Sequence, residues 1–178
     1  MTLVQAPPRD LFGPGQSQAI RELFQGIFVA ELVHPSRELW LLFGWISDVE
    51  ILDNRSRQFS SLRADWPATQ IRLSAVLEAL VERGSTLLVV LRDVPHNQSF
   101  VEKLRDLGSR FPGKVRVAVG PEVHEKGLLG DDFLVSGSMN LTFNGMWVND
   151  EHVSLRTDSG SVEEWRVAFH QKWGGKLT

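Results

Sequence analysis

An alternation of continuous apolar runs with amphipathic segments constrains the fold of this chain more than any other feature. Apolar runs typical of buried strands occur at 39–46, 86–91 and 115–119, and apolar residues recur at helical spacing between them, at 71–83 and 97–110. Alternating strands and helices are typical of parallel strands that are covered on both faces. The sequence therefore predicts an α/β sandwich whose front half is a mostly parallel sheet.

The two ends of the pattern and the region after Gly120 extend this prediction. Apolar residues at helical spacing predict one helix that follows Ser17 as its N-cap and another over about 161–173. Short strands are predicted near 123–129, 133–135 and 152–155. Such short strands indicate added antiparallel pairing, so we expect a mixed, mostly parallel β-sheet flanked by helices.

Two segments interrupt the regular pattern. Residues 1–16 carry three prolines and two glycines and are predicted to form an irregular N-terminal leader. Residues 48–67 are polar and are predicted to form a long, partly ordered excursion, a kind of loop that is often functional. The 178 residues suit about one domain, and we expect residues 17–178 to form it.

Composition excludes several classes of site. The chain has no cysteine, which excludes disulfides, Cys-ligated metals and cysteine nucleophiles. The net charge of −3 provides no overall attraction to nucleic acid or to an anionic membrane, so binding of a polyanion would need a local basic patch. No secretory signal is visible, and the apolar stretches are too short to span a bilayer. We expect a cytoplasmic protein with no membrane partner.

The segment 123–151 concentrates the residues that can carry chemistry. His124 and Lys126 are two residues apart, so on a strand they would point to the same face. The candidate residues of the segment are, in chain order, His124, Lys126, Asp131, Ser138, Asn140 and Glu151.

These residue types suit phosphoryl transfer. A neutral His is a nucleophile or a general acid–base near neutral pH, and a neighbouring carboxylate can fix its tautomer. Lys, Ser and Asn side chains donate hydrogen bonds to anionic oxygens. Because positioning and charge stabilisation dominate phosphoryl transfer, a nucleophilic His among such donors indicates that reaction.

Three short patterns in this segment resemble motifs of the phospholipase D superfamily. The stretch 124–131 matches H-x-K-x4-D, the stretch 137–140 matches G-S-x-N, and the stretch 149–151 resembles N-x-E. The three patterns occur in the order and at the spacing of that family. The resemblance covers about residues 115–156 closely, and the β/α alternation before it agrees with the family's fold.

The resemblance implies a metal-independent phosphodiesterase that needs no cofactor. His124 would attack phosphorus and form a covalent phosphohistidine, and Glu151 of the same subunit would orient His124. Asp131 would support the geometry of the motif. The phosphate oxygens would be held by Lys126, Ser138 and Asn140.

The resemblance also implies a homodimer. The family uses two H-x-K-x4-D motifs per active site, the second His protonating the leaving oxygen, and this chain has one full motif. A two-fold axis would place two copies of His124 face to face. Single-motif members include small bacterial endonucleases, and members of anti-phage and DNA-modification clusters look similar. We therefore expect a nuclease acting on DNA or RNA, with a place in a larger defence or DNA-processing complex as a further expectation.

Other interpretations stay open at this point. The chain could act on phospholipids, or it could be a nucleic-acid-binding or scaffolding subunit with little activity. Trp45 and Trp147 are candidates for stacking on bases, and Arg55 and Arg57 for contacts to a phosphate backbone; core packing and a solvated loop are the alternatives. His96 follows the strand 86–91 and is interpreted as a surface residue, with a place near a site at the strand ends as the alternative. The metal-ligand motifs are absent, so we expect no metal.

Overall fold

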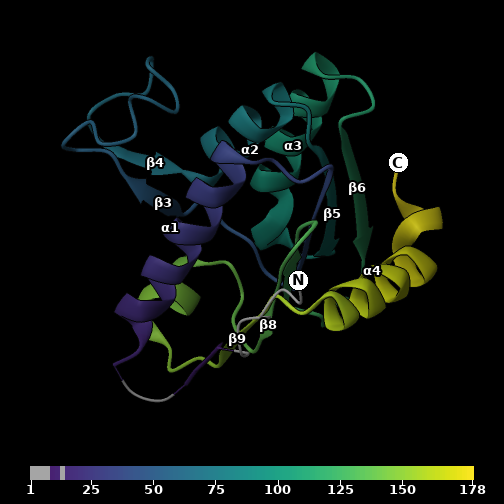
Figure 1. The fold of residues 1–178 in the computed structure, drawn as a ribbon. Helices are drawn as coiled ribbons and strands as arrows, with labels where there is room; N and C mark the ends of the chain where they lie inside the picture. The colour runs from purple at the N-terminus through teal and green to yellow at the C-terminus, as the bar shows by residue number, and fades with distance from the viewer. Residues whose placement is uncertain (1–8, 13–14) are drawn as a thin grey trace, which may run out of the picture.

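A seven-stranded mixed sheet forms the centre of the molecule (Figure 1). The computed structural model describes residues 9–12 and 15–178. Strands β2, β5 and β6 are parallel, and the pairs from β2 through β7, β8 and β9 to β1 are antiparallel. This arrangement confirms the predicted mixed sheet, with its parallel front half and antiparallel additions after Gly120. In spatial order the strands are β1 (Arg9–Leu11), β9 (Val153–Arg156), β8 (Leu134–Gly137), β7 (Gly127–Leu129), β2 (Glu38–Phe43), β5 (Thr86–Arg92) and β6 (Val115–Gly120).

Helices cover both faces of the sheet. Helices α1, α2 and α3 pack on one face, and α4 packs on the other (Figure 1). The main helices are α1 (Ser17–Val33), α2 (Leu73–Glu82), α3 (Gln98–Arg110) and α4 (Ser159–Trp173). Three short helical turns complete the set: η1 (Pro95–Asn97), the π-helical η2 (Asn144–Val148) and η3 (Gly174–Lys176).

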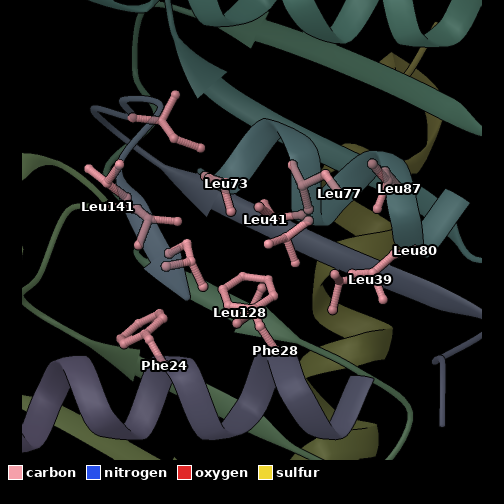
Figure 2. Packing of buried hydrophobic residues seen from close by; sticks show 14 of the residues in the cluster. Phe24, Phe28, Leu39, Leu41, Leu73, Leu77, Leu80, Leu87, Leu128 and Leu141 are labelled. Atoms are coloured by element: carbon pink, nitrogen blue, oxygen red, sulfur yellow. The ribbon is translucent and has the colours of Figure 1, made fainter. Parts of the chain in front are cut away.

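Strand β2 is buried on both faces, which explains its continuous apolar run. Leu41 lies in the core formed with α1, α2 and α3, whereas its neighbour Trp40 lies in the core formed with α4. This division follows from the two-residue period of a strand. Figure 2 shows Phe24 and Phe28 pointing from α1 toward the sheet. Each such buried side chain stabilises the fold by roughly 2 kcal/mol.

The beginning of the chain differs from the prediction. Within the expected leader, residues Arg9–Leu11 form the edge strand β1, which pairs with β9. The strand was not visible in the sequence because its residues are exposed or half-buried and carry no apolar pattern. Residues 1–8 and 13–14 of the leader lie outside the described residues. The capping prediction is also wrong: Gln16 occupies the N-cap position and Ser17 is the first helical residue.

The polar segment 48–67 contains more regular structure than expected. Strand β3 (Glu50–Asp53) pairs with β4 (Gln70–Arg72) in a separate two-stranded sheet. The loop between them is closed by the buried Asn54, whose Nδ2 donates to the Pro67 carbonyl oxygen at 2.8 Å. Asn54 Oδ1 also accepts from the backbone N of Phe59 at 3.0 Å.

Among the described residues, none of the helices combines the length and the apolar character that crossing a lipid bilayer requires.

Candidate active site

Strand register brings the motif segments to one end of the sheet. Leu42 of β2 pairs with Gly127 of β7, Gly127 pairs with Ser136 of β8, and Gly137 pairs with Val153 of β9. The residues just before β7, just after β8 and just before β9 therefore lie together, beside the residues that follow β2. We call this region the His124 end of the sheet; it comprises residues 123–126, 138–140, 149–151 and 44–47.

His124 and Lys126 do not lie on a strand, which corrects the sequence prediction. Strand β7 begins only at Gly127. The Lys126 ammonium turns back along the chain and donates to the His124 carbonyl oxygen at 2.9 Å. The imidazole of His124 is exposed and has no hydrogen-bond partner among the described residues. The ring is therefore open to a substrate or to a second protein molecule.

Glu125 anchors this segment to α4. Its carboxylate accepts from the backbone N of His124 at 3.1 Å and forms an ion pair with Lys172. Partial burial opposes the charge of Glu125, but hydrogen bonds from Lys172 and from backbone N–H groups hold its pKa below the ordinary value. The backbone beside His124 is thus held in place while the imidazole stays unbonded.

Ser138 and Glu151 bind each other instead of His124. The Ser138 hydroxyl donates to Glu151 Oε2 at 2.5 Å, and Asn149 Nδ2 donates to Glu151 Oε1 at 3.2 Å. The expected contact in which Glu151 orients His124 is therefore absent in the single chain, because both carboxylate oxygens are engaged within the loop. The Ser138 hydroxyl also accepts from the backbone N of His152 at 3.0 Å.

Gly137 shapes the loop that carries Ser138. Its φ of 152° lies in a region that side chains with a Cβ rarely adopt. A Cβ on this residue would fall 2.0 Å from the His152 carbonyl oxygen. That close approach lets Ser138 N donate to His152 O at 2.9 Å. The glycine of the G-S-x-N pattern is thus a steric requirement of the loop.

Asn140 connects the loop to the end of β2. Its Oδ1 accepts from the backbone N of Trp45 at 3.1 Å, which leaves its NH₂ group without a hydrogen-bond partner among the described residues. A Cβ placed on Gly44 would be 3.4 Å from Asn140 Oδ1 and 3.4 Å from the Val123 carbonyl oxygen. Asn140 therefore lies close to the backbone that leads into His124.

Asp131 lies at the opposite end of β7 from His124. Its Oδ2 accepts from Arg37 through the backbone N at 3.1 Å and through Nε at 3.3 Å. Arg166 of α4 donates to the carbonyl oxygens of Gly130 and Asp131 at 2.9 and 3.1 Å. Asp131 thus connects the end of β7 to the start of β2. From this end of the strand it does not contact a phosphate held by His124.

Comparison with known proteins identifies the fold. No protein-family profile and no curated protein sequence matches the chain. The solved structure of NucT from Helicobacter pylori is similar at a TM-score of 0.64 and 14% identity, covering 97% of this chain and 98% of that one. Nuc from Salmonella typhimurium, a phospholipase D family member, is similar at 0.61 and 12% identity, covering 97% of both chains.

Phosphatidylserine synthase from Haemophilus influenzae is similar at a TM-score of 0.60 and 15% identity, over 96% of this chain and 39% of that one. The chain has the phospholipase D superfamily fold. The fold expected from the three sequence patterns is therefore shown. The roles of the individual site residues stay predictions.

The four residues proposed to contact nucleic acid do not all line one hollow of this phospholipase D fold in the part of the chain that the structure describes. Trp45 lies at the His124 end, with the Arg92 guanidinium 5.3 Å from its ring centre. Trp147 and Arg55 line a different hollow of about 540 Å³. Arg55 is bound to Asp53 at 2.6 Å, and its hydrogen bonds lower the pKa of Asp53 to about 2. Arg57 is exposed in the loop between β3 and β4.

Two residues lie beside the His124 end: His96, interpreted from the sequence as a surface residue with a place near a site at the strand ends as the alternative, and Asn97, which the sequence interpretation does not include. His96 follows β5, whose end lies beside the end of β2, and its Nε2 is 2.9 Å from the Ser47 hydroxyl. The adjacent Asn97 is buried, donates to the carbonyl oxygens of Gly44 and Arg92, and accepts from the backbone N of Ile46. The signal was present, since residues that follow neighbouring parallel strands lie at the same edge of a sheet.

The donor set of this site does not suit a metal. In the described part of the phospholipase D fold, no group of three or more His, Asp and Glu side chains is placed to hold a metal ion. The functional groups at the His124 end include the His124 imidazole, the Lys126 ammonium, the amides of Asn140 and Asn149, and the Glu151 carboxylate, which accepts a hydrogen bond from the Ser138 hydroxyl. Such a set suits an anionic oxygen better than a cation.

Proposed function

We propose that this protein is a metal-independent phosphodiesterase that cleaves nucleic acid. The observation that carries the proposal is the exposed, unbonded imidazole of His124, with Lys126 and the free amide of Asn140 at the same end of a phospholipase D fold. The similarity to NucT and Nuc over nearly the whole of both chains supports this choice. The Lys126 ammonium, which is cationic, and the Asn140 amide, which is neutral, would donate hydrogen bonds that hold the phosphate oxygens.

The proposed reaction has two steps. In the first, a nitrogen of His124 attacks phosphorus, the bond from phosphorus to the leaving oxygen breaks, and a second imidazole gives its proton to that oxygen. In the second, water attacks the phosphohistidine, the phosphorus–nitrogen bond breaks, and the second imidazole takes a proton from the water. Together the two steps return the two imidazoles to their starting forms.

The second imidazole would come from a second copy of the chain. The chain has one full H-x-K-x4-D pattern, since the second H-x-K stretch, 170–172, is followed by Leu177 where the pattern has Asp, and the His124 ring is open to the outside of the single chain. A two-fold axis through this end would bring two copies of His124 together and make the interface self-complementary. Such a dimer would also give Glu151 a route to a ring that it does not reach within one chain.

Cleavage assays with matched histidine variants test the activity. Purified protein would be incubated in EDTA with labelled single-stranded DNA, duplex DNA, RNA and a phospholipid. We expect cleavage of nucleic acid that is lost in His124→Ala and kept in His34→Ala, since His34 is an exposed histidine at the other end of the sheet. Turnover of lipid alone would favour a phospholipid phosphodiesterase. Binding without cleavage would favour a scaffolding subunit.

A subunit-mixing experiment tests the shared site. Wild-type protein would be mixed with increasing amounts of His124→Ala protein and allowed to exchange subunits, and light scattering would report the oligomeric state. If each site needs one imidazole from each copy, activity should fall as the square of the wild-type fraction. A linear fall, or full activity in a monomer, would contradict the shared site.

A further inference from the structure

A hollow of about 360 Å³ opens beside the His124 end, and it differs chemically from its surroundings. Its lining includes the aromatic rings of Trp45 and Phe143 and the polar groups of Ser47, His96 and Asn140. No Lys, Arg, Asp or Glu is among the described residues that line it. A lining of rings, amides and hydroxyls favours a flat, neutral, hydrogen-bonding ligand over a phosphate or a cation.

The two rings offer surfaces for stacking. Phe143 is 60% exposed, and its ring is stacked on Trp147 with 5.3 Å between centroids and 9° between planes. Trp45 is 36% exposed and has the Arg92 guanidinium over its ring at 5.3 Å. Side chains that are supported in this way lose little freedom when a ligand stacks on them.

The backbone around the hollow is fixed before any ligand binds. Ser47 N donates to the Leu141 carbonyl oxygen at 2.9 Å, which joins the end of β2 to the 138–149 loop. Buried Asn97 joins the ends of β2 and β5 through Gly44 and Arg92, at 2.9 and 2.8 Å. His96 is therefore held by its neighbour at the rim, where its ring and the Ser47 hydroxyl provide donor and acceptor atoms.

The hollow adjoins the proposed phosphate position through two motif residues. Asn140 contributes to its lining, has a free NH₂ group, and lies on the same loop that carries Ser138. Asn149 also lines it, and Asn149 Nδ2 binds the Glu151 carboxylate at 3.2 Å. A group in the hollow would thus be close enough to belong to the nucleotide whose phosphate is held beside His124.

We propose that this hollow binds an unpaired nucleobase next to the scissile phosphate, so that the enzyme selects single-stranded nucleic acid. The inference rests on the proposed function, because it names the substrate class of that site. A base in a duplex has its faces covered by stacking and its edge used by pairing, whereas an unpaired base can stack on the rings and bond through its edge. Phosphate contacts alone would not distinguish the two.

The test measures binding separately from cleavage. His124→Ala protein would be titrated with a fluorescent single-stranded oligonucleotide, with the same strand in duplex, and with a strand of the same length made of abasic sugar-phosphate units. We expect the base-containing single strand to bind about 10-fold to 100-fold more tightly than the abasic strand, because stacking on an aromatic side chain contributes that much per base.

Variants of the hollow locate the effect. Adding Phe143→Ala or His96→Ala should bring the affinity for the base-containing strand down toward that for the abasic strand and leave the abasic strand unchanged. Phe12→Ala is the matched control, since Phe12 is 71% exposed and is not among the residues that line the hollow. Phe12→Ala with His124 restored should cleave both strands at the wild-type rate.

The outcomes separate the two proposals. Equal binding of base-containing and abasic strands, or affinities that Phe143→Ala and His96→Ala leave unchanged, would overturn the base site, even if cleavage depended on His124. Loss of binding to both strands in Phe143→Ala would also overturn it, because the role would not be specific to the base. Absence of cleavage by the wild type, with base-dependent binding intact, would overturn the proposed activity and retain the base site.

Discussion

The two ends of strand β7 hold their polar side chains in different ways. At the His124 end, within residues 9–12 and 15–178, the imidazole has no hydrogen-bond partner, the Asn140 amide has a free NH₂, and Lys126 has a hydrogen bond only to a backbone oxygen. At the other end Asp131 binds Arg37 twice, and its own backbone N donates to Ser36 Oγ at 2.8 Å. One end of the same motif therefore keeps its side chains available, and the other uses them to join secondary-structure elements.

Because of this difference, we expect substitutions within one sequence motif to have different kinds of effect. Substitutions at the His124 end should change activity more than stability, and substitutions at the Asp131 end should do the reverse. The hydrogen bonds explain the division, because a side chain without partners contributes little to folding, whereas a side chain that bonds another element contributes those hydrogen bonds to stability.

The largest effect is expected for His124→Ala. Cleavage should fall on the order of 10³-fold or more, because a nucleophile cannot be replaced by the remaining donors. The free energy of unfolding should change by less than about 0.5 kcal/mol, since the ring is exposed and unbonded. Chemical denaturation and a rate measurement on one preparation check both. A clear loss of stability would show that the His124 end is also structural.

The comparison also shows which features a sequence can reveal. The strands of the front half could be predicted because burial on both faces makes each of them a continuous apolar run, as in β2 and β5. Strand β1 could not, because its three residues pair at an exposed edge and carry no periodic signal. Strand β3 was hidden for another reason: its buried Ile51 and Leu52 are only two apolar residues within a polar segment.

Side-chain partners were harder to predict than the site itself. The patterns placed His124, Ser138, Asn140 and Glu151 in one region, and the strand register brings their segments together. The partner of Glu151 could not be inferred, because it depends on the path of the loop after Gly137, where Ser138 is turned toward the carboxylate. Motif spacing fixes which segments meet, and loop geometry decides which atoms bond.

Gly137→Ala tests whether the His124 end requires a fixed backbone conformation even though its side chains have few partners. The new Cβ would meet the His152 carbonyl oxygen and require an unfavourable φ, so unfolding should become easier by roughly 3 kcal/mol. Activity should fall as well, because Ser138 and Asn140 would move. Gly26→Ala is the control: nothing lies within 4 Å of its added Cβ, and in a helix it should stabilise by about 0.5–1 kcal/mol. Equal stability of the two variants would refute the steric role.

Asp131→Ala tests the other end directly. It removes the acceptor of the Arg37 backbone N and side chain, and because both of these hydrogen bonds are exposed we expect a loss of about 0.5–1.5 kcal/mol in the free energy of unfolding. The cleavage rate of the folded fraction should stay within about threefold of the wild type, a factor that corresponds to less than 1 kcal/mol. Asp132→Ala provides the exposed neighbour as a control. A large fall in rate without a fall in stability would place Asp131 in the chemistry and break the comparison.

The smallest effect concerns the acid–base behaviour of the Asp131 end. Glu31 is buried, and this burial raises its pKa, although hydrogen bonds from Ser36 N and Oγ partly offset the shift. A raised pKa in the folded protein means that the contribution of Glu31 to stability is complete below its unfolded pKa of about 4.3 and is lost as the pH rises through the folded value. Glu31→Gln removes this titration. The stability of Glu31→Gln relative to the wild type should therefore increase as the pH rises above the unfolded pKa. The lowered pKa values of Asp53 and Glu125 affect both proteins equally and cancel in this difference. Urea denaturation at several pH values measures this difference, and a difference that does not vary with pH would show that the folded protein leaves the pKa of Glu31 unchanged.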